Sequence, residues 1–292
     1  MDFQRVEQDN HHLVPAGISI EDLSTFTTHL KASRRILAIC GAGLSASSGM
    51  ATFRGAGGIW RTHSAKDLST PEAFKRDPVL VWQFHAELRR ASLAAVPNNG
   101  HTALAKLGRE RGEDFLTIML NIDGLSERAG HPLDALSVLH GSIFDIRCVN
   151  CDFEETTFQE PLVPALSATW AADRPTTLRD LPHCPDCHAL LRPGVIWFGE
   201  CLSDDIMDRI EHWISSEAVD LLLVVGTTAA LSSITGYSND ARDTGARMAV
   251  INPDLEAVEA VGGLDNGDWW FGGDAAEVLP CLLWPALRAG DG

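Results

Sequence analysis

The sequence has 292 residues, of which 45% are hydrophobic and 22% charged, a mixture typical of globular proteins and not of disordered chains. Its net charge of −17 at pH 7 argues against direct binding of nucleic acid and favours lysine-rich partners, although solubility alone also explains it. The apolar runs are shorter than a membrane-spanning helix needs, so no membrane association is expected. The polar, acidic N-terminal segment has neither a secretory nor a transit-peptide pattern, which predicts an intracellular location, cytoplasmic or nuclear rather than mitochondrial.

Helical and strand patterns alternate along the chain after a tail at residues 1–17. Residues 19–33 have apolar positions at helical spacing. Short apolar runs typical of buried parallel strands are residues 35–40, 115–120, 219–225 and 247–251. The helices expected between them are residues 80–93, 97–111 and 204–216. This alternation predicts an α/β fold, a Rossmann-like parallel sheet with helices on both faces, whose ligands bind beyond the carboxyl ends of the strands.

A glycine motif follows the first of these strands. The segment GAGLSA, residues 41–46, matches the G-x-G-x-x-G/A pattern that brings the backbone and the N-terminus of the next helix close to a pyrophosphate. A plain tight turn is the alternative. The acidic residue that usually follows about 20 residues later is not evident. Residues 51–60 form instead a glycine-rich segment with one arginine and aromatic side chains, typical of a flap over a cofactor or of an ordinary surface loop.

Two pairs of cysteines stand in a segment without clear periodicity, residues 148–193. Each C-x-x-C pair can supply two thiolate ligands, and together they complete a tetrahedral site without a position for water. The expected ligands of this structural zinc are Cys148, Cys151, Cys184 and Cys187. Unrelated free thiols are the alternative. The other three cysteines are expected to be ordinary core or surface residues.

Polar residues follow two further apolar runs. Asn121, Ile122 and Asp123 come after residues 115–120, and His140 comes after residues 136–139. A lone histidine is usually structural, but its near-neutral pKa suits a general base if it faces a cofactor. The apolar and aromatic residues 195–200 are expected to form a core strand.

Together these motifs resemble those of the sirtuins, the NAD-dependent protein deacylases. The matching pieces occur in the family's order: GAGLSASSGMATFRGAGGIW (41–60), NIDGL (121–125), HGS (140–142), the two C-x-x-C pairs, RPGVIWFGE (192–200), GTT (226–228) and IN (251–252). The resemblance implies a Rossmann-like NAD-binding domain of residues 18–147 and 194–287, with a flap and helical lobe at 60–97. It also implies a zinc-binding module at 148–193 and a C-terminal tail at 288–292.

The resemblance implies where NAD binds. The phosphates would lie at Gly41, Ala42 and Gly43, with Ser45 in the same pocket. The nicotinamide end would contact Phe53, Arg54, Trp60, Asn121, Ile122 and Asp123. The adenosine half would contact Gly226, Thr227, Thr228, Asn252 and Ala275.

The resemblance also implies the reaction. The acyl oxygen of an acyl-lysine attacks the nicotinamide ribose, nicotinamide leaves, and His140 acts as general base with Asn121 and Asp123 as the other catalytic residues. The products are lysine, nicotinamide and O-acyl-ADP-ribose. Histones or metabolic enzymes are candidate substrates. The peptide is expected to pair as an added strand with a segment whose substrate-binding residues are Val195, Trp197, Phe198, Gly199 and Glu200.

Within the family, residues 53–60 and 67–74 most resemble the class III branch, which includes enzymes that remove succinyl and malonyl groups. There a tyrosine and, three residues later, an arginine hold the acyl carboxylate. Here His85 and Leu88 stand at those positions, with Arg89 one place late. Because residues four apart share a helix face, His85 and Arg89 are predicted to bind an acidic acyl group, although Arg89 could simply be solvated.

Two further departures are Leu120 in place of a glutamine that contacts a ribose hydroxyl, and Ser126 in place of a histidine. They leave two alternatives to a deacylase. One is a protein ADP-ribosyltransferase, which would differ in its product. The other is a weakly active module that binds NAD and acyl-peptides, against which the retained His140, Asn121 and Asp123 argue.

Overall fold

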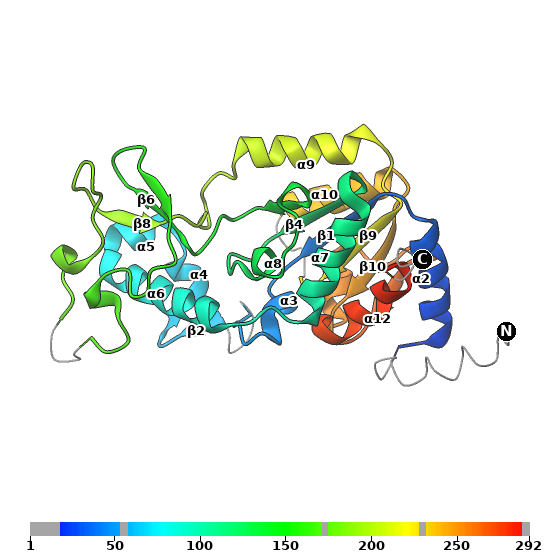
Figure 1. Cartoon of the computed structure of the whole chain (residues 1–292), viewed down its shortest axis with the longest axis horizontal. Helices are drawn as coiled ribbons and strands as arrows, with labels where there is room; N and C mark the ends of the chain where they lie inside the picture. Colours follow the sequence, from blue (N-terminus) through cyan, green and yellow to red (C-terminus); the bar gives the residue numbers. More distant parts are fainter. Residues whose placement is uncertain (1–17, 53–57, 171–174, 228–231, 288–292) are drawn as a thin grey trace.

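The computed structural model describes residues 18–52, 58–170, 175–227 and 232–287. A larger α/β part and a smaller part lie side by side along the long axis, and the first and last described helices both belong to the larger part (Figure 1). Across the described ranges, every helix is too short or too polar to span a bilayer. The predicted fold class is confirmed by the sheet described next.

The larger part is built on six parallel strands. They are β1 (Ile36–Cys40), β4 (Phe115–Met119), β5 (Leu136–Val138), β9 (Leu221–Val225), β10 (Arg247–Ile251) and β11 (Trp269–Phe271). Their order is β11-β10-β9-β1-β4-β5, so β1 lies between β9 and β4. Every residue of β1, β4 and β9 is buried, as expected for parallel strands covered on both faces. From β1 the chain adds β4 and β5 on one side, and it then returns to add β9, β10 and β11 on the other side. Folds of this kind bind ligands at the point where the strand order reverses.

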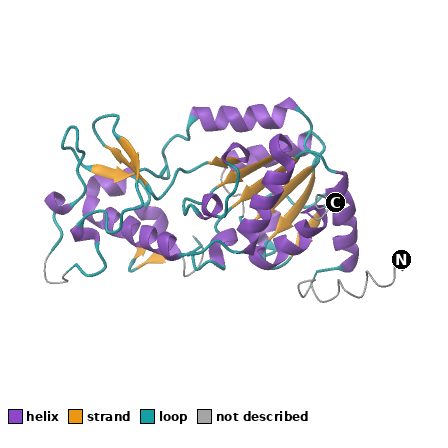
Figure 2. Ribbon diagram, in the orientation of Figure 1, coloured by secondary structure: helices purple, strands orange, loops and turns teal. Residues whose placement is uncertain are grey.

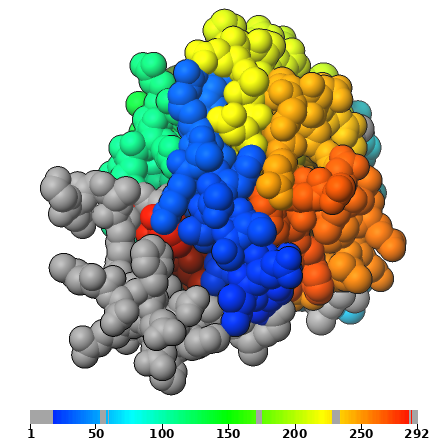
Figure 3. All heavy atoms as spheres, turned by 90° about the vertical axis from the view of Figure 1, so that its right-hand side faces the viewer, coloured from blue at the N-terminus to red at the C-terminus, as the bar shows by residue number. Residues whose placement is uncertain are grey.

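Helices cover both faces of this sheet (Figure 2). One face carries α2 (Ile20–Ala32), α7 (Asn99–Arg111) and α12 (Ala275–Leu287), and the blue α2 runs along the surface in Figure 3. The other carries α9 (Asp204–Ser216), α10 (Ser232–Asp243) and α11 (Glu256–Ala260). Alternate residues of β1 enter the two cores, since side chains of a strand point to opposite faces. The short α3 (Gly43–Ala46) and α8 (Leu125–Arg128) follow β1 and β4.

The smaller part combines two segments of the chain around one core. The first holds β2 (Ile59–Trp60), β3 (His63–Ser64), α4 (Ala65–Leu68), α5 (Pro71–Arg76) and α6 (Pro78–Ala94). The second is an antiparallel sheet in the order β7 (Glu154–Thr156), β6 (Asp145–Cys148), β8 (Leu191–Pro193). Apolar side chains of α5 and α6 pack against this sheet. The long α6 is capped by Asp77, whose carboxylate accepts a hydrogen bond from the backbone N–H of Leu80.

The core strand expected at residues 195–200 is wrong, because the structure has a loop there. Its backbone N–H groups bond to three different places. Ile196 donates to the carbonyl of His140 at 2.9 Å, and Phe198 donates to that of Ser69 at 2.9 Å. Trp197 donates to the carboxylate of Glu200 at 2.8 Å. These scattered acceptors, two of them far away in the sequence, replace a strand ladder, and one of them brings the loop beside His140.

Candidate functional site

A cleft of about 1150 Å³ lies between the carboxyl ends of the sheet strands and the smaller part. Its walls come from the loops after β1, β4, β5, β9 and β10 and from α6. Many residues that the sequence singled out line this one cavity. They are Gly41, Ala42, Gly43, Ser45, Trp60, His85, Asn121, Ile122, Asp123, His140, Val195, Trp197, Phe198, Gly199, Glu200, Gly226, Thr227, Asn252 and Ala275. Phe53, Arg54 and Thr228 lie outside the described residues.

The glycine turn after β1 packs directly against the turn after β9. A Cβ atom on Gly41 would lie 2.6 Å from Cβ of Thr227, and one on Gly43 would lie 2.6 Å from Cα of Gly226. Gly226 itself has a φ of +57°. Contact between two turns therefore demands these glycines, whatever ligand binds there. The structure thus adds a reason for glycine that the motif alone did not indicate.

The helix after the glycine turn, α3, is a single turn. The amide of Gly43 donates to the carbonyl of Gly226 at 2.8 Å. The amides of Leu44 and Ser45 donate to the carbonyls of Gly41 and Ala42. These N–H groups are used within the protein, so they do not form the row of free helix amides that the sequence led us to expect.

Asn121 joins the ends of β1 and β4 inside the cleft. Its Nδ2 donates to the carbonyl of Gly41 and to Oγ of Ser45, each at 3.0 Å. The neighbouring Asp123 is buried and accepts a hydrogen bond from the backbone N–H of Leu125 at 2.9 Å. Burial raises the pKa of Asp123, and hydrogen bonds from the Ser45 side chain and the Leu125 amide oppose this. These bonds fix the orientation of both side chains.

His140 has a defined tautomer. Its Nδ1 lies 2.9 Å from the carbonyl oxygen of Leu120, which can only accept, so Nδ1 carries the hydrogen. Burial lowers the pKa of His140, although the hydrogen bond to Leu120 opposes this. The ring is therefore neutral near pH 7, and its Nε2 is the basic nitrogen.

His85 lines the cleft from α6 and uses both ring nitrogens. Its Nδ1 donates to the carbonyl of Val81 at 2.8 Å, and its Nε2 accepts from Nε1 of Trp197 at 3.1 Å. Burial lowers the pKa of His85 to about 4. The imidazole is thus neutral at physiological pH and positions Trp197.

Arg89 does not reach the cleft, contrary to its predicted role beside His85. Its guanidinium donates to the backbone carbonyls of Ile143 at 3.0 Å, Gln159 at 3.2 Å and Thr157. Nε lies 3.8 Å from a carboxylate oxygen of Glu160. Only 3% of the side chain is exposed, so it is not solvated either. Arg89 extends from α6 toward residues 157–160 and fastens the helix to the smaller sheet.

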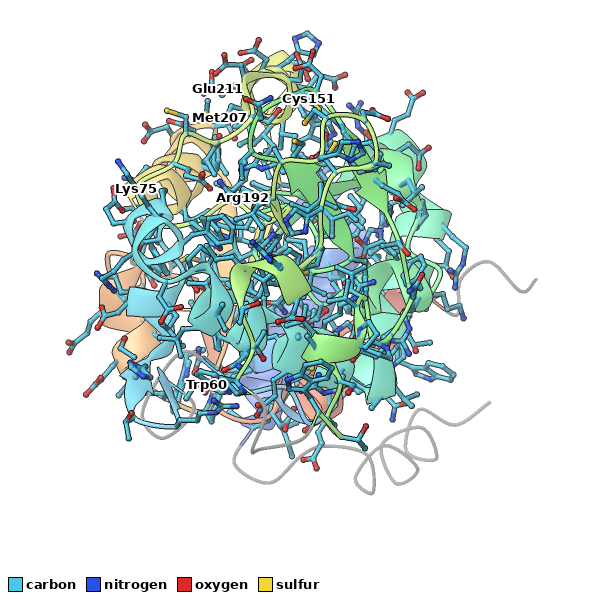
Figure 4. All side chains as sticks on the ribbon, turned by 90° about the vertical axis from the view of Figure 1, so that its left-hand side faces the viewer. Trp60, Lys75, Cys151, Arg192, Met207 and Glu211 are labelled. Carbon is cyan, nitrogen blue, oxygen red and sulfur yellow. The ribbon has the colours of Figure 1, made fainter. Side chains whose placement is uncertain are left out.

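The four predicted zinc ligands lie together at the smaller antiparallel sheet. Their sulfur atoms lie within 4.8 Å of one another. Cys148 Sγ is 3.4 Å from Cys187 Sγ, and Cys151 Sγ is 3.6 Å from Cys184 Sγ. Tetrahedral zinc with Zn–S bonds of about 2.3 Å places its sulfurs about 3.8 Å apart, so the cluster fits a structural zinc. Figure 4 shows Cys151 far from the labelled Trp60 of the cleft, at opposite edges of this end of the molecule.

The structure adds residues that the motifs did not single out. His101 of α7 is buried and reaches Ser45, which precedes it by 56 positions. Ala65, Phe84, Leu88 and Ile143 line the cleft around His85. The capping pattern of Asn98 and His101 predicts the start of α7 from the sequence. It gives no indication that His101 contacts Ser45 in the glycine turn.

Comparisons with known proteins agree with this geometry. Residues 41–233 match the model of the Sir2 family. The chain is 39% identical to an NAD-dependent protein deacylase of Candida albicans, over 91% of this chain and 98% of the relative. It is 37% identical to the NAD-dependent protein deacylase sirtuin-5, mitochondrial, of Danio rerio, over 90% of this chain and 86% of the relative.

Solved structures give the same result. A Sir2 homologue in complex with NAD has a TM-score of 0.75 and 32% identity, and the match covers 95% of this chain and 98% of that one. A mutant Sir2 homologue in complex with 2′-O-acetyl ADP-ribose has a TM-score of 0.77 and 32% identity, with coverages of 94% and 100%. The chain therefore belongs to the Sir2 family of NAD-dependent protein deacylases.

Proposed function

We propose that this deacylase acts on acyl-lysine side chains of proteins and that His140 is its general base. The observation that carries the proposal is the tautomer of His140. Its Nδ1 is held by the carbonyl of Leu120 at 2.9 Å, and the neutral ring lines the cleft with Nε2 as its basic atom. A base of this kind is already unprotonated at the pH at which it must accept a proton.

The neighbouring polar residues support binding of NAD in the same cleft. Bound NAD would supply a nicotinamide leaving group and a ribose that accepts the acyl group. With one water molecule consumed to release the lysine amine, the products are nicotinamide, lysine and O-acyl-ADP-ribose. Asn121, Asp123 and Ser45 hold one another by hydrogen bonds and would orient the nicotinamide end. Strict orientation of the acyl amide against the nicotinamide ribose should raise the reaction rate strongly, because an amide oxygen is a weak nucleophile.

The other end of the cleft suits the adenosine half. Asn252 donates from Nδ2 to the carbonyl of Thr227 at 3.3 Å, which joins the ends of β10 and β9. Ala275, at the start of α12, completes this wall. We extend the proposal to Phe53, Arg54 and Thr228, whose sequence positions correspond to the family's NAD contacts.

The loop of residues 195–200 would receive the substrate peptide. The amides of Ile196, Trp197 and Phe198 already have acceptors within the protein. An added substrate strand would therefore pair with the other backbone groups of this loop. Substrate proteins rich in lysine, histones or metabolic enzymes among them, suit the net charge of −17.

The test is deacylation of acyl-lysine peptides with NAD, followed by mass spectrometry of both products. We expect His140→Ala to reduce turnover by about 10²–10⁴-fold while NAD binding, measured by calorimetry, persists. His212→Ala changes an exposed histidine on α9 and serves as the control. Because burial lowers the pKa of His140, the acid limb of kcat/KM should lie below pH 6.5.

The products also separate the alternatives. Transfer of ADP-ribose to a protein, without O-acyl-ADP-ribose, would indicate a protein ADP-ribosyltransferase. Binding of NAD and acyl-peptide without turnover would indicate a binding module. Near-normal deacylation by His140→Ala would remove His140 from the mechanism.

A further inference from the structure

The charged side chains that line the cleft share one sign. Among the described residues, the lining contains no lysine or arginine. The carboxylates are Glu87, Asp123, Glu200, Asp254 and Asp274. The carboxylate of a ligand that entered this cleft would therefore face like charges, with no lysine or arginine among the described lining residues.

Three arginines lie near this part of the cleft without lining it. The guanidinium of Arg61 lies 4.2 Å from the ring centroid of Trp60 and donates a hydrogen bond to Gln83. Arg89 is bonded to backbone carbonyls and to Glu160. Arg192 contacts both carboxylate oxygens of Glu200, at 2.5 and 2.9 Å, and its guanidinium lies 3.6 Å from the ring centroid of Trp197. Turning Arg89 or Arg192 toward a ligand would break charge-assisted bonds to partly buried partners, which is costly.

An apolar pocket occupies this part of the cleft instead. Trp60, Ala65, Phe84 and Leu88 line the cleft and pack in one apolar cluster. The neighbouring His85 is neutral, because both ring nitrogens are used and burial lowers its pKa to about 4. His85, the titratable side chain that could have been the cation of this pocket, therefore carries no charge.

Contacts place this pocket beside the proposed base. The carbonyl of His140 accepts from the amide of Ile196, the next residue is Trp197, and Trp197 donates to His85 on α6. Phe84 and Leu88 flank His85 on the same helix. An acyl chain whose carbonyl lies near His140 can therefore extend past Trp197 and His85 toward Trp60.

The pocket offers one neutral donor. The indole N–H of Trp60 is buried and has no acceptor within the part of the chain that the structure describes. It could bond to an oxygen of an acyl chain. A single neutral donor does not balance the full charge of a buried carboxylate.

We propose that this pocket selects neutral, apolar acyl groups longer than acetyl, such as butyryl or hexanoyl, and excludes acyl groups that end in a carboxylate. The inference rests on the proposed function, since it assumes an acyl-lysine substrate. Each methylene group that becomes buried should improve kcat/KM by about fourfold until the pocket is filled. A succinyl or malonyl group would bring a carboxylate into a pocket whose described lining residues include no cation.

The experiment compares peptides of one sequence that carry acetyl, butyryl, hexanoyl, succinyl or malonyl on the same lysine, with the unmodified protein and NAD. We expect butyryl to exceed acetyl by about sixteenfold in kcat/KM, hexanoyl to do at least as well as butyryl, and both to exceed succinyl by about 100-fold. Succinyl removal as fast as butyryl removal would overturn this inference alone. Failure to remove any acyl group would overturn the proposed function and this inference with it.

A variant pair tests the location of the pocket. Leu88→Arg places a cation in the lining, and Val96→Arg adds the same charge at an exposed position just beyond α6. We expect Leu88→Arg to raise the ratio of succinyl to butyryl removal by about tenfold or more, and Val96→Arg to leave the ratio unchanged. Leu88→Met keeps an apolar side chain and should keep the original order. Equal ratios in all three variants would contradict the assigned pocket, and the acyl series with the unmodified protein decides the matter if Leu88→Arg does not fold.

Discussion

His101 donates a hydrogen bond from Nε2 to the hydroxyl of Ser45, with 3.3 Å between the two atoms. The direction follows from the other ring nitrogen, because Nδ1 accepts from the backbone N–H of Asn98 at 3.2 Å. Asn121 also donates to Ser45. Two donors occupy the acceptor positions of the hydroxyl, so its own hydrogen is directed to the carboxylate of Asp123. A buried histidine on α7 thus orients three residues of the proposed NAD site.

The first prediction concerns this histidine. His101→Leu removes one donor from Ser45, and a lost neutral hydrogen bond is worth about 0.5–1.5 kcal/mol. We expect the KM for NAD to rise about two- to twelvefold while the KM for the peptide stays constant. His101→Gln retains a donor and should restore part of the loss.

The matched control is His131→Leu, which removes another buried histidine, one that bonds to Thr117 in the core and does not line the cleft. It should lower the melting temperature without changing the KM for NAD. Equal changes in KM for the two variants would show that His101 acts only through stability.

The second prediction concerns Leu120, whose carbonyl holds His140 and whose side chain lines the cleft. Leu120→Gln adds a donor that can reach a ribose hydroxyl. We expect kcat/KM for NAD to rise by about two- to twelvefold, the value of one neutral hydrogen bond. Leu120→Met has similar volume and no donor. A glutamine variant no better than the methionine variant would mean that the pocket is built around leucine.

The third prediction concerns Arg89, whose guanidinium is bonded to three carbonyls and Glu160. Arg89→Met removes the charged partner of these acceptors, of which the carbonyl of Ile143 is buried, so we expect the free energy of unfolding to fall by about 2–4 kcal/mol. Arg90→Met, at a more exposed arginine that also contacts Glu160, should cost less. Denaturant unfolding measures both. A selective loss of succinyl removal would restore the carboxylate-binding role that the sequence suggested.

The fourth prediction concerns the metal. Elemental analysis should find one zinc per chain, held by Cys148, Cys151, Cys184 and Cys187. Cys151→Ala or a strong chelator should remove the zinc and lower the melting temperature, because the cysteines pack in the core of the smaller part. Cys201→Ala changes an exposed cysteine outside the cluster and should keep the zinc. Folded native protein without zinc would refute the assignment.

The fifth prediction concerns acid. Burial lowers the pKa of His85 and of His101 from 6.5 to about 4. As the pH falls, the unfolded chain binds these protons first. The contribution to stability is therefore fully present above pH 6.5 and is lost between pH 6.5 and 4, by up to about 1.4 kcal/mol per pH unit for each histidine.

Urea unfolding at several pH values measures this slope. His101→Leu should reduce it by up to one histidine's share, and His212→Leu, at an exposed position, should not. A slope that is identical in the two variants would contradict the buried, neutral state of His101.

Local patterns in the sequence determined the architecture and the place of the site. Apolar runs followed by glycine or polar residues predicted β1, β4 and β9, and parallel strands bring their carboxyl ends to one edge. The gathering of Gly41, Asn121, His140 and Gly226 around one cleft follows from that rule. The spacing within each C-x-x-C pair likewise suffices to predict the metal cluster, because two ligands on one short turn are a local property.

Only the tertiary structure decided what the individual side chains do. Consecutive residues of a helix point about 100° apart, so Leu88 lines the cleft while Arg89 turns to the smaller sheet, and no local rule says which face meets which neighbour. The loop at 195–200 replaced a strand because its acceptors come from distant residues such as Ser69. The bond between His101 and Ser45 has the same origin, since it joins two helices that are brought together by packing on one face of the sheet.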